Sequence, residues 1–162
     1  MIGVLLAPCA LWAQGPGYRV YLFMSETCPI CQHYTLPLRN LHRDFAADSV
    51  QFIGVFPNRH STPEAVAAFG AKYKLPFALA PDDSLKSTTR HWQATVTPEV
   101  VVARGDSVLY RGRIDDGYAR VGRRRTVVTT HELRDVLMAI RAGKPVAVGP
   151  TTPIGCFINF KY

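Results

Sequence analysis

The pattern of apolar and polar positions first predicts a strand, a helix and a second strand. Residues 19–24 (RVYLFM) and 50–56 (VQFIGVF) are apolar and β-prone, which is typical of buried strands. Between them, residues 29–47 carry apolar side chains three or four positions apart, and this spacing places them on one face of a helix. These positions are Ile30, Tyr34, Leu38, Leu41 and Phe45.

Beyond residue 60 the pattern predicts two further helices and a hairpin. Residues 64–73 follow a Ser-Thr-Pro-Glu start, with proline in the first helical turn. Asp82 or Asp83 is expected to cap a helix that runs to about residue 92. Residues 99–103 and 107–111 read as strands joined by Arg-Gly-Asp, a short hairpin connection.

The composition is that of one ordinary globular domain. The chain has 162 residues, of which 48% are hydrophobic and 19% charged, so global disorder is not expected. The formal net charge is +7, and much of the excess lies in arginines between residues 111 and 125. These arginines have no interleaved aromatic stacking platform, so we favour a solvated basic loop facing an acidic partner over a nucleic-acid site.

The sequence Cys28-Pro29-Ile30-Cys31 falls where the first predicted strand meets the first predicted helix. The free N–H groups and the dipole of a helix N-terminus favour a thiolate at the first cysteine, and the thiolate is the nucleophile. The second thiol, about one turn further on, can attack a mixed disulfide and release the product. Pro29 suits the first turn, where a missing N–H costs nothing. We assign Cys28 as the nucleophile and Cys31 as the resolving cysteine.

Two other uses of this cysteine pair remain open. A zinc site needs a second Cys-x-x-Cys or a Cys/His pair at ligand spacing, and here only His33 and His42 follow on the predicted helix. A purely structural disulfide is the other alternative, although so short a loop removes little entropy from the unfolded chain.

The N-terminal segment, residues 1–17, is interpreted as an export signal. Residues 1–13 are almost wholly apolar, and this run is too short for a transmembrane helix, which needs about 20 residues. We expect cleavage near Ala13 or Gln14 and a periplasmic or other extracytoplasmic location. The sequence before Cys9 faintly resembles a lipoprotein attachment site, which would anchor the protein to a membrane. A buried N-terminal strand is the remaining alternative.

The order of these motifs resembles the thioredoxin fold, and most closely its exported redoxin and thiol–disulfide oxidoreductase branch. The resemblance covers residues 19–143 and is carried by Cys-Pro-Ile-Cys after a strand, LPFALAPDDSL, Thr-Pro before a hairpin, and VLYRGRIDD. It implies an α/β thioredoxin-like fold: a central mixed β-sheet flanked by helices, with an inserted helix and a C-terminal extension. It also implies that Thr97-Pro98 is a cis-proline dipeptide beside the cysteines. The implied substrate groove comprises Pro29, Ile30, Val96, Thr97 and Pro98.

Around the cysteines the chain departs from thioredoxin itself. Thr27 replaces the usual tryptophan, Pro29-Ile30 replaces Gly-Pro, and the first strand lacks the buried acid that assists proton transfer. The intervening dipeptide tunes the reduction potential, which spans about −270 to −120 mV in related redox proteins. The direction of electron flow is therefore left open.

The C-terminal third extends beyond a minimal thioredoxin. Residues 114–130 form a basic insertion in which Asp115 and Asp116 are cation ligands or, as we favour, an exposed turn. A helix from residue 130 closes at Gly143, and a tail rich in Pro, Gly and Thr follows. With RIDD and GKPV, the terminal GCFI resembles a subgroup of bacterial exported redoxins. Cys156 is then a candidate third redox thiol or metal ligand, or simply a small residue that helps the tail to dock.

We expect an export segment (1–17), a thioredoxin-like domain (18–143) and a tail (144–162). The favoured function is an exported, monomeric thiol–disulfide oxidoreductase without cofactor or bound metal, which acts on cysteine-containing proteins and a redox partner protein. A peroxidase of the peroxiredoxin type is the first alternative, although its PxxxTxxC arrangement is absent. The second is a copper or other metal carrier that uses the two cysteines and a histidine such as His91.

Overall fold

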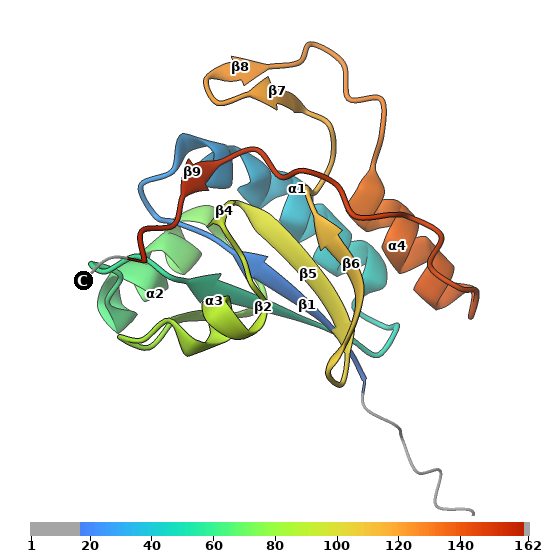
Figure 1. Ribbon diagram of the computed structural model, residues 1–162, viewed down its shortest axis with the longest axis horizontal. Coiled ribbons are helices and arrows are strands. Elements are labelled where there is room, and N and C mark those ends of the chain that lie inside the picture. The colour runs from blue at the N-terminus through green and yellow to red at the C-terminus, as the bar shows by residue number, and fades with distance from the viewer. Residues whose placement is uncertain (1–16, 161–162) are drawn as a thin grey trace, which may run out of the picture.

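The computed structural model describes residues 17–160 (Figure 1). The predicted export segment lies outside the described residues, apart from Gly17. Within the described part of the chain, no helix combines the length and the hydrophobicity that crossing a bilayer requires.

A β-α-β unit starts the fold. It consists of β1 (Tyr18–Phe23), α1 (Pro29–Phe45) and β2 (Val50–Phe56). The two strands are parallel, with Val20 opposite Phe52, so α1 is the crossover that parallel neighbours require. The first three predicted elements are therefore confirmed, with α1 ending two residues before its predicted end.

A five-stranded mixed sheet forms the centre of the molecule, in the order β3-β2-β1-β5-β6. β3 (Ala78–Pro81) is parallel to β2 and extends that side of the sheet. β5 (Glu99–Arg104) is antiparallel to β1, and β6 (Ser107–Gly112) returns beside β5 as the predicted hairpin. The expected central mixed sheet is confirmed.

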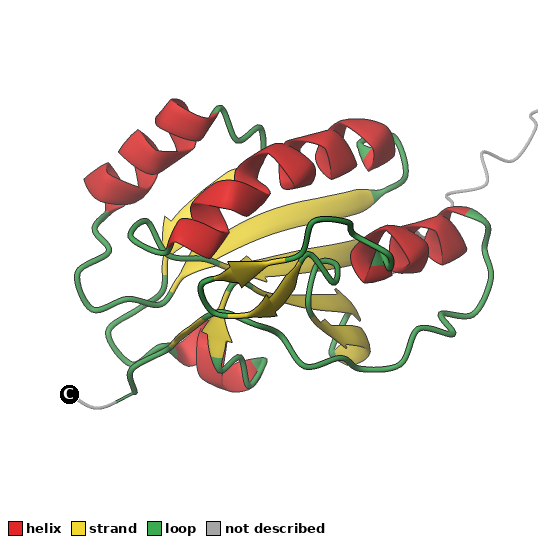
Figure 2. Cartoon of the chain, turned by 90° about the horizontal axis from the view of Figure 1, so that it is seen from above, coloured by secondary structure: helices red, strands yellow, loops and turns green. Residues whose placement is uncertain are grey.

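Helices cover both faces of the sheet (Figure 2). On one face lie α1, α2 (Pro63–Tyr73) and α4 (Glu132–Arg141), whereas α3 (Ser87–His91) lies on the other. Thr62 caps α2, because its hydroxyl accepts a hydrogen bond from Ala65 N at 3.2 Å.

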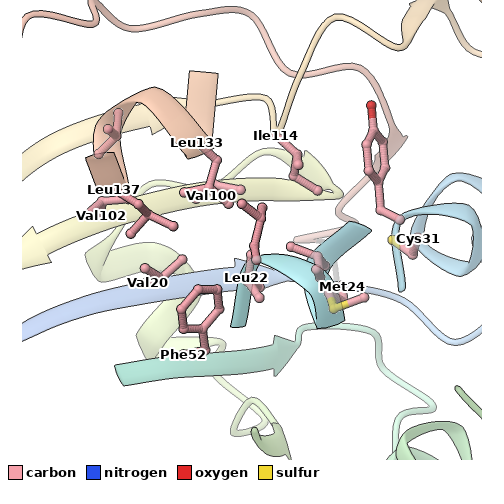
Figure 3. Close-up of a cluster of buried hydrophobic side chains, with 14 of the residues drawn as sticks. Val20, Leu22, Met24, Cys31, Phe52, Val100, Val102, Ile114, Leu133 and Leu137 are labelled. Atoms are coloured by element: carbon pink, nitrogen blue, oxygen red, sulfur yellow. The ribbon is translucent and has the colours of Figure 1, made fainter. Parts of the chain in front are cut away.

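The two faces of β1 supply two hydrophobic cores, because successive side chains of a strand point to opposite sides. Val20 and Leu22 join the larger core beneath α1 and α4 (Figure 3). Phe23 joins a smaller cluster that includes Trp92, next to α3. The larger core extends to Cys31 and so reaches the cysteine pair.

The helix predicted from Asp82 or Asp83 to about residue 92 is wrong in its extent. The helix starts only at Ser87, because Lys86 before it has a left-handed backbone (φ 53°) that cannot continue a helix. Asp83 does serve the helix start, since its carboxylate accepts from Ser87 N at 3.0 Å.

The basic insertion forms a hairpin of β7 (Tyr118–Arg120) and β8 (Arg123–Arg124) that projects from the body of the protein (Figure 1). The prediction of an exposed turn at the base of this hairpin is wrong for Asp116, whose exposed fraction is only 5%. Its carboxylate accepts hydrogen bonds from Thr129 N at 2.8 Å and Thr130 N at 3.1 Å. These bonds replace the water that the carboxylate loses on burial.

Candidate active site

Cys28 is the N-cap residue of α1. Its backbone is extended (φ −80°, ψ 116°), its N–H donates to Ser25 O at 3.3 Å, and its carbonyl accepts from Gln32 N at 3.0 Å. Pro29 occupies the first turn, which contains no acidic side chain. The free N–H groups of this helix end therefore act on the Cys28 sulfur without a competing negative charge in that turn.

Cys31 lies one helical turn further on and is fully buried. Its thiol donates a hydrogen bond to the Cys28 sulfur, and this bond is the largest contribution that lowers the pKa of Cys28 to about 5. Burial opposes this effect, while the Cys156 thiol and the N–H groups of Cys31 and Ile30 reinforce it. Burial and the bond to Cys28 raise the pKa of Cys31 well above its ordinary value.

The two cysteines are thus set for different tasks at neutral pH. Cys28 is ionised and nucleophilic, whereas Cys31 holds its proton until a partner sulfur has bonded to Cys28 and removed the thiolate charge. This arrangement supports disulfide exchange with Cys28 as the attacking group.

Thr97 and Pro98 lie beside this pair. The peptide bond between them is cis, as the resemblance implied, and Thr97 O is 3.3 Å from Cys28 Sγ. The protonated Cys28 thiol donates to this carbonyl, whereas the thiolate can only accept, from the thiols of Cys31 and Cys156. Thr97 belongs to β4 (Val96–Thr97), a short strand separate from the central sheet.

Cys156 completes the group of sulfurs. It lies on β9 (Cys156–Phe157), the only partner of β4 within residues 17–160, and its Sγ is 3.1 Å from Cys28 Sγ. Burial, and then the bond to Cys28, raise the pKa of Cys156 to about 11. The sequence analysis proposed Cys156 as a candidate redox thiol. Its position next to Cys28 could not be predicted, because it depends on the pairing of β4 with β9, which no local sequence pattern indicates.

A cavity of about 570 Å³ opens beside the reactive sulfur. Cys28, Thr97 and Cys156 lie in its wall together with loop residues 25–27 and 58–61, which follow β1 and β2. This position leaves room next to Cys28 for part of a bound partner.

The five residues predicted to line the substrate groove differ in their exposure. Thr97 lines the cavity, and Pro29 is exposed at the start of α1. The side chains of Ile30, Val96 and Pro98 are buried.

The sequence analysis did not predict a group of aromatic side chains that joins the first turns of α1 to the basic hairpin. His33 and Tyr34 of α1 meet the ring of Tyr118 from the basic hairpin, with ring centroids 5.6 and 5.9 Å from it. Tyr34 donates its hydroxyl hydrogen to Asp115, which fixes the base of the hairpin to α1. Burial raises the pKa of Tyr118; the Arg124 charge opposes this effect, and the smaller effects of the Cys28 and Asp115 charges reinforce it. The hairpin therefore lies within electrostatic reach of Cys28.

The metal-carrier alternative requires a set of metal ligands, and the described residues contain none. Among residues 17–160, no group of three or more His, Cys, Asp or Glu side chains is placed to hold a metal ion. His91, the histidine suggested for such a site, is exposed and contacts the ring of Trp92. Asp115 and Asp116 are engaged by Tyr34 and by the backbone of residues 129–130.

Two solved structures resemble this chain over most of its length. An uncharacterized conserved protein from Geobacillus kaustophilus has a TM-score of 0.78 at 26% identity, covering 90% of this chain and 78% of its own. A hypothetical protein from Sinorhizobium meliloti 1021 has a TM-score of 0.77 at 26% identity, with coverages of 90% and 81%.

A secreted Mycobacterium tuberculosis disulfide oxidoreductase, homologous to E. coli DsbE, shares the fold at a TM-score of 0.53 and 19% identity. That match covers 80% of this chain and 83% of the other. The thioredoxin-like fold implied by the sequence is confirmed. No curated protein matches the chain. The sequence profile of the AhpC/TSA family, however, matches residues 12–116, and the chain belongs to this family of thioredoxin-like redoxins.

Proposed function

We propose that the protein is a thiol–disulfide oxidoreductase that exchanges disulfides with cysteine-containing proteins through Cys28. The observation that carries this proposal is the pairing of an acidic Cys28 thiol, with a pKa of about 5, with a buried and protonated Cys31. Two neighbouring thiols with divergent pKa values divide the roles of nucleophile and resolving group.

In the reducing direction, the Cys28 thiolate attacks a sulfur of the substrate disulfide. A bond forms between Cys28 and that sulfur, and the other substrate sulfur leaves as a thiolate. Cys31 then loses its proton and attacks Cys28 Sγ, which releases the second substrate thiol and leaves a Cys28–Cys31 disulfide. The redox partner protein restores the two thiols, and the oxidising direction reverses these steps.

Insulin reduction in the presence of dithiothreitol tests this proposal. Cys28→Ser should abolish catalysed reduction, because it removes the nucleophile. In a separate incubation without dithiothreitol, Cys31→Ser combined with Cys156→Ser should accumulate a covalent Cys28–substrate species that mass spectrometry detects, because no neighbouring thiol remains to resolve it. Cys9→Ser, at the cysteine outside the described residues, is the matched control and should keep full activity. Undiminished insulin reduction by Cys28→Ser would refute the proposal.

We also propose that the protein is exported. The support is the apolar run of residues 1–13, which is typical of a signal peptide. In an oxidising compartment the CPIC pair would exchange electrons with a dedicated partner protein. Cell fractionation and the mass of the mature N-terminus test this, with cleavage near residue 13 or 14 expected. An uncleaved chain found only in the cytoplasm would contradict it.

Peroxide reduction is the second candidate, favoured by the same depressed pKa. Peroxide oxidises the thiolate form of a cysteine, and the product is a sulfenic acid. The thiol of Cys31 or Cys156 could then condense with this sulfenic acid to form a disulfide. Rapid Cys28-dependent consumption of hydrogen peroxide, faster than turnover of insulin, would place this activity first.

A further inference from the structure

The C-terminal tail leaves α4 and runs back across the molecule to the redox site (Figure 1). It is fixed before and after β9. Thr151 N donates to Arg111 O at 3.1 Å, and the Thr151 hydroxyl accepts from Arg113 N at 3.1 Å. Ile158 N donates to Thr95 O at 2.9 Å, and the Ile158 side chain is buried in the cluster next to α3. β9 is therefore held over the site from both sides.

The register of β9 puts a cysteine against the nucleophile. β9 is antiparallel to β4, with Cys156 opposite Thr97 and Phe157 opposite Val96. In this register the Cys156 and Cys28 sulfurs are 3.1 Å apart, and Cys28 is only 2% exposed. Phe157 is the next residue of the strand, so its side chain points to the opposite face, and it is 89% exposed.

The same geometry defines how an outside segment would reach Cys28. An extended segment that pairs with β4 sets one side chain opposite Thr97, and that side chain meets the Cys28 sulfur. In this structure the tail already occupies that position. A partner segment in the same register must displace β9 first.

We propose that β9 is a built-in substrate strand, in which Cys156 takes the place of a substrate cysteine and exchanges with the Cys28–Cys31 disulfide. The proposal rests on the proposed function, because it uses the same nucleophilic sulfur.

The exchange is balanced without any outside reagent. In the oxidised protein the Cys156 sulfur gives up its proton and attacks Cys28 Sγ. The Cys28–Cys156 bond forms, the Cys28–Cys31 bond breaks, and the electron pair of the broken bond goes to Cys31. Cys31 takes up the proton, so the step is an isomerisation in which the number of disulfides is unchanged.

Disulfide mapping tests whether Cys156 can displace a sulfur that is bonded to Cys28, with glutathione standing in for Cys31. The full chain with Cys9→Ser and Cys31→Ser is equilibrated with oxidised glutathione, digested in acid and analysed by mass spectrometry. Glutathione first bonds to Cys28; Cys156 should then displace it, which leaves a Cys28–Cys156 peptide as the main product. Stable glutathione on Cys28, with Cys156 free, would overturn the proposal.

Strand displacement provides a second test that leaves all sulfurs in place. A Cβ at Gly155 would lie 2.2 Å from Thr97 O, so Gly155→Ala should lift β9 from β4. Gly149→Ala is the matched control in the same tail, because a Cβ there meets nothing within 4 Å. Gly155→Ala should speed alkylation of Cys28 by iodoacetamide at least about tenfold, as expected for opening of a local segment, and should reduce the Cys28–Cys156 product. Equal rates and products in the two variants would contradict the placement of β9.

These outcomes separate the two proposals. If the Cys28–Cys156 disulfide forms but insulin is not reduced, the proposed function fails and the reactive strand stands. If insulin is reduced through Cys28 while Cys156 never bonds to it, only the built-in strand is refuted.

Discussion

The sulfur of Cys28 lies 3.3 Å from the backbone oxygen of Thr97, a residue 69 positions further along the chain. A carbonyl can accept a hydrogen bond from a thiol but offers nothing to a thiolate. Ionisation of Cys28 therefore exchanges this bond for those donated by the thiols of Cys31 and Cys156. The balance between these hydrogen bonds therefore contributes to the pKa of Cys28.

The first prediction concerns that acidity. Thiolate absorbance of the reduced protein, followed against pH, should show Cys28 titrating near pH 5. Cys31→Ala should raise the pKa of Cys28 more than Cys156→Ala does, because the Cys31 hydrogen bond is the larger contribution. A Cys28 pKa close to the free value of about 8.5 in the unaltered protein would contradict the site geometry.

The second prediction is a change of slope in the reduction potential near pH 5. Below this pH the reduced pair carries two protons, and the potential should fall by about 59 mV per pH unit. Above it Cys28 is a thiolate, one proton accompanies the two electrons, and the slope should halve to about 30 mV. Equilibration with glutathione buffers across this range measures it. A uniform slope from pH 4 to pH 7, roughly one unit below to two above the Cys28 pKa, would show that Cys28 does not ionise there.

Much of the redox centre could be predicted from sequence because its signals are local. The helix periodicity from Ile30 to Phe45 and the proline after Cys28 together define a helix start, and a helix start explains an acidic cysteine. The buried strands could be predicted equally well, since four consecutive apolar residues, Val100 to Ala103, form the centre of β5.

The features that could not be predicted depend on contacts between distant residues. The pairing of Thr97 with Cys156 joins segments 59 residues apart through a strand of two residues, which is too short to show any periodicity. Asp116 sits in a sequence that resembles a turn, and only the fold brings Thr129 to satisfy it. In both cases the partner, not the local sequence, determines the environment.

The third prediction concerns Asp116. Hydrogen bonds from the Thr129 hydroxyl and from the backbone of Thr129 and Thr130 lower the pKa of Asp116 from 3.8 to about 2. An acid whose folded pKa is depressed stabilises the fold above its unfolded pKa, and this contribution is lost as pH falls through the folded value. Asp116→Asn replaces one accepting oxygen by a donor, so it should lower the free energy of unfolding by about 1–2 kcal/mol at neutral pH.

Urea unfolding at several pH values measures this effect. The difference between the unaltered protein and Asp116→Asn should shrink as pH falls from about 4 to about 2, because the unaltered carboxyl then protonates as well. Asp106→Asn, in the exposed turn between β5 and β6, is the control and should change stability little. A difference that stays constant over this interval would mean that the Asp116 charge is not what stabilises the base of the hairpin.

The last prediction concerns the ion pair that joins the end of β6 to the start of α4. Arg113 Nε donates to Glu132 Oε1 at 2.8 Å, and the Glu132 side chain is only 8% exposed. Arg113→Ala would leave a buried carboxylate with the Thr130 hydroxyl as its remaining side-chain partner, since the other Glu132 oxygen already has none. Breaking one side of a buried pair costs more than the pair itself contributes, so a loss of about 2–3 kcal/mol in unfolding free energy is expected.

Arg43→Ala is the comparison, because the Arg43 side chain is 72% exposed and its pair with Asp44 should contribute less than about 1 kcal/mol. Arg113→Lys should recover only part of the loss, since a lysine ammonium cannot supply both donors of the guanidinium to one carboxylate. Arg113 also donates its backbone N–H to Thr151, and that bond survives both substitutions, so the tail should remain attached while α4 loosens. If Arg113→Ala destabilised the protein no more than Arg43→Ala does, the carboxylate of Glu132 would have to be solvated rather than buried.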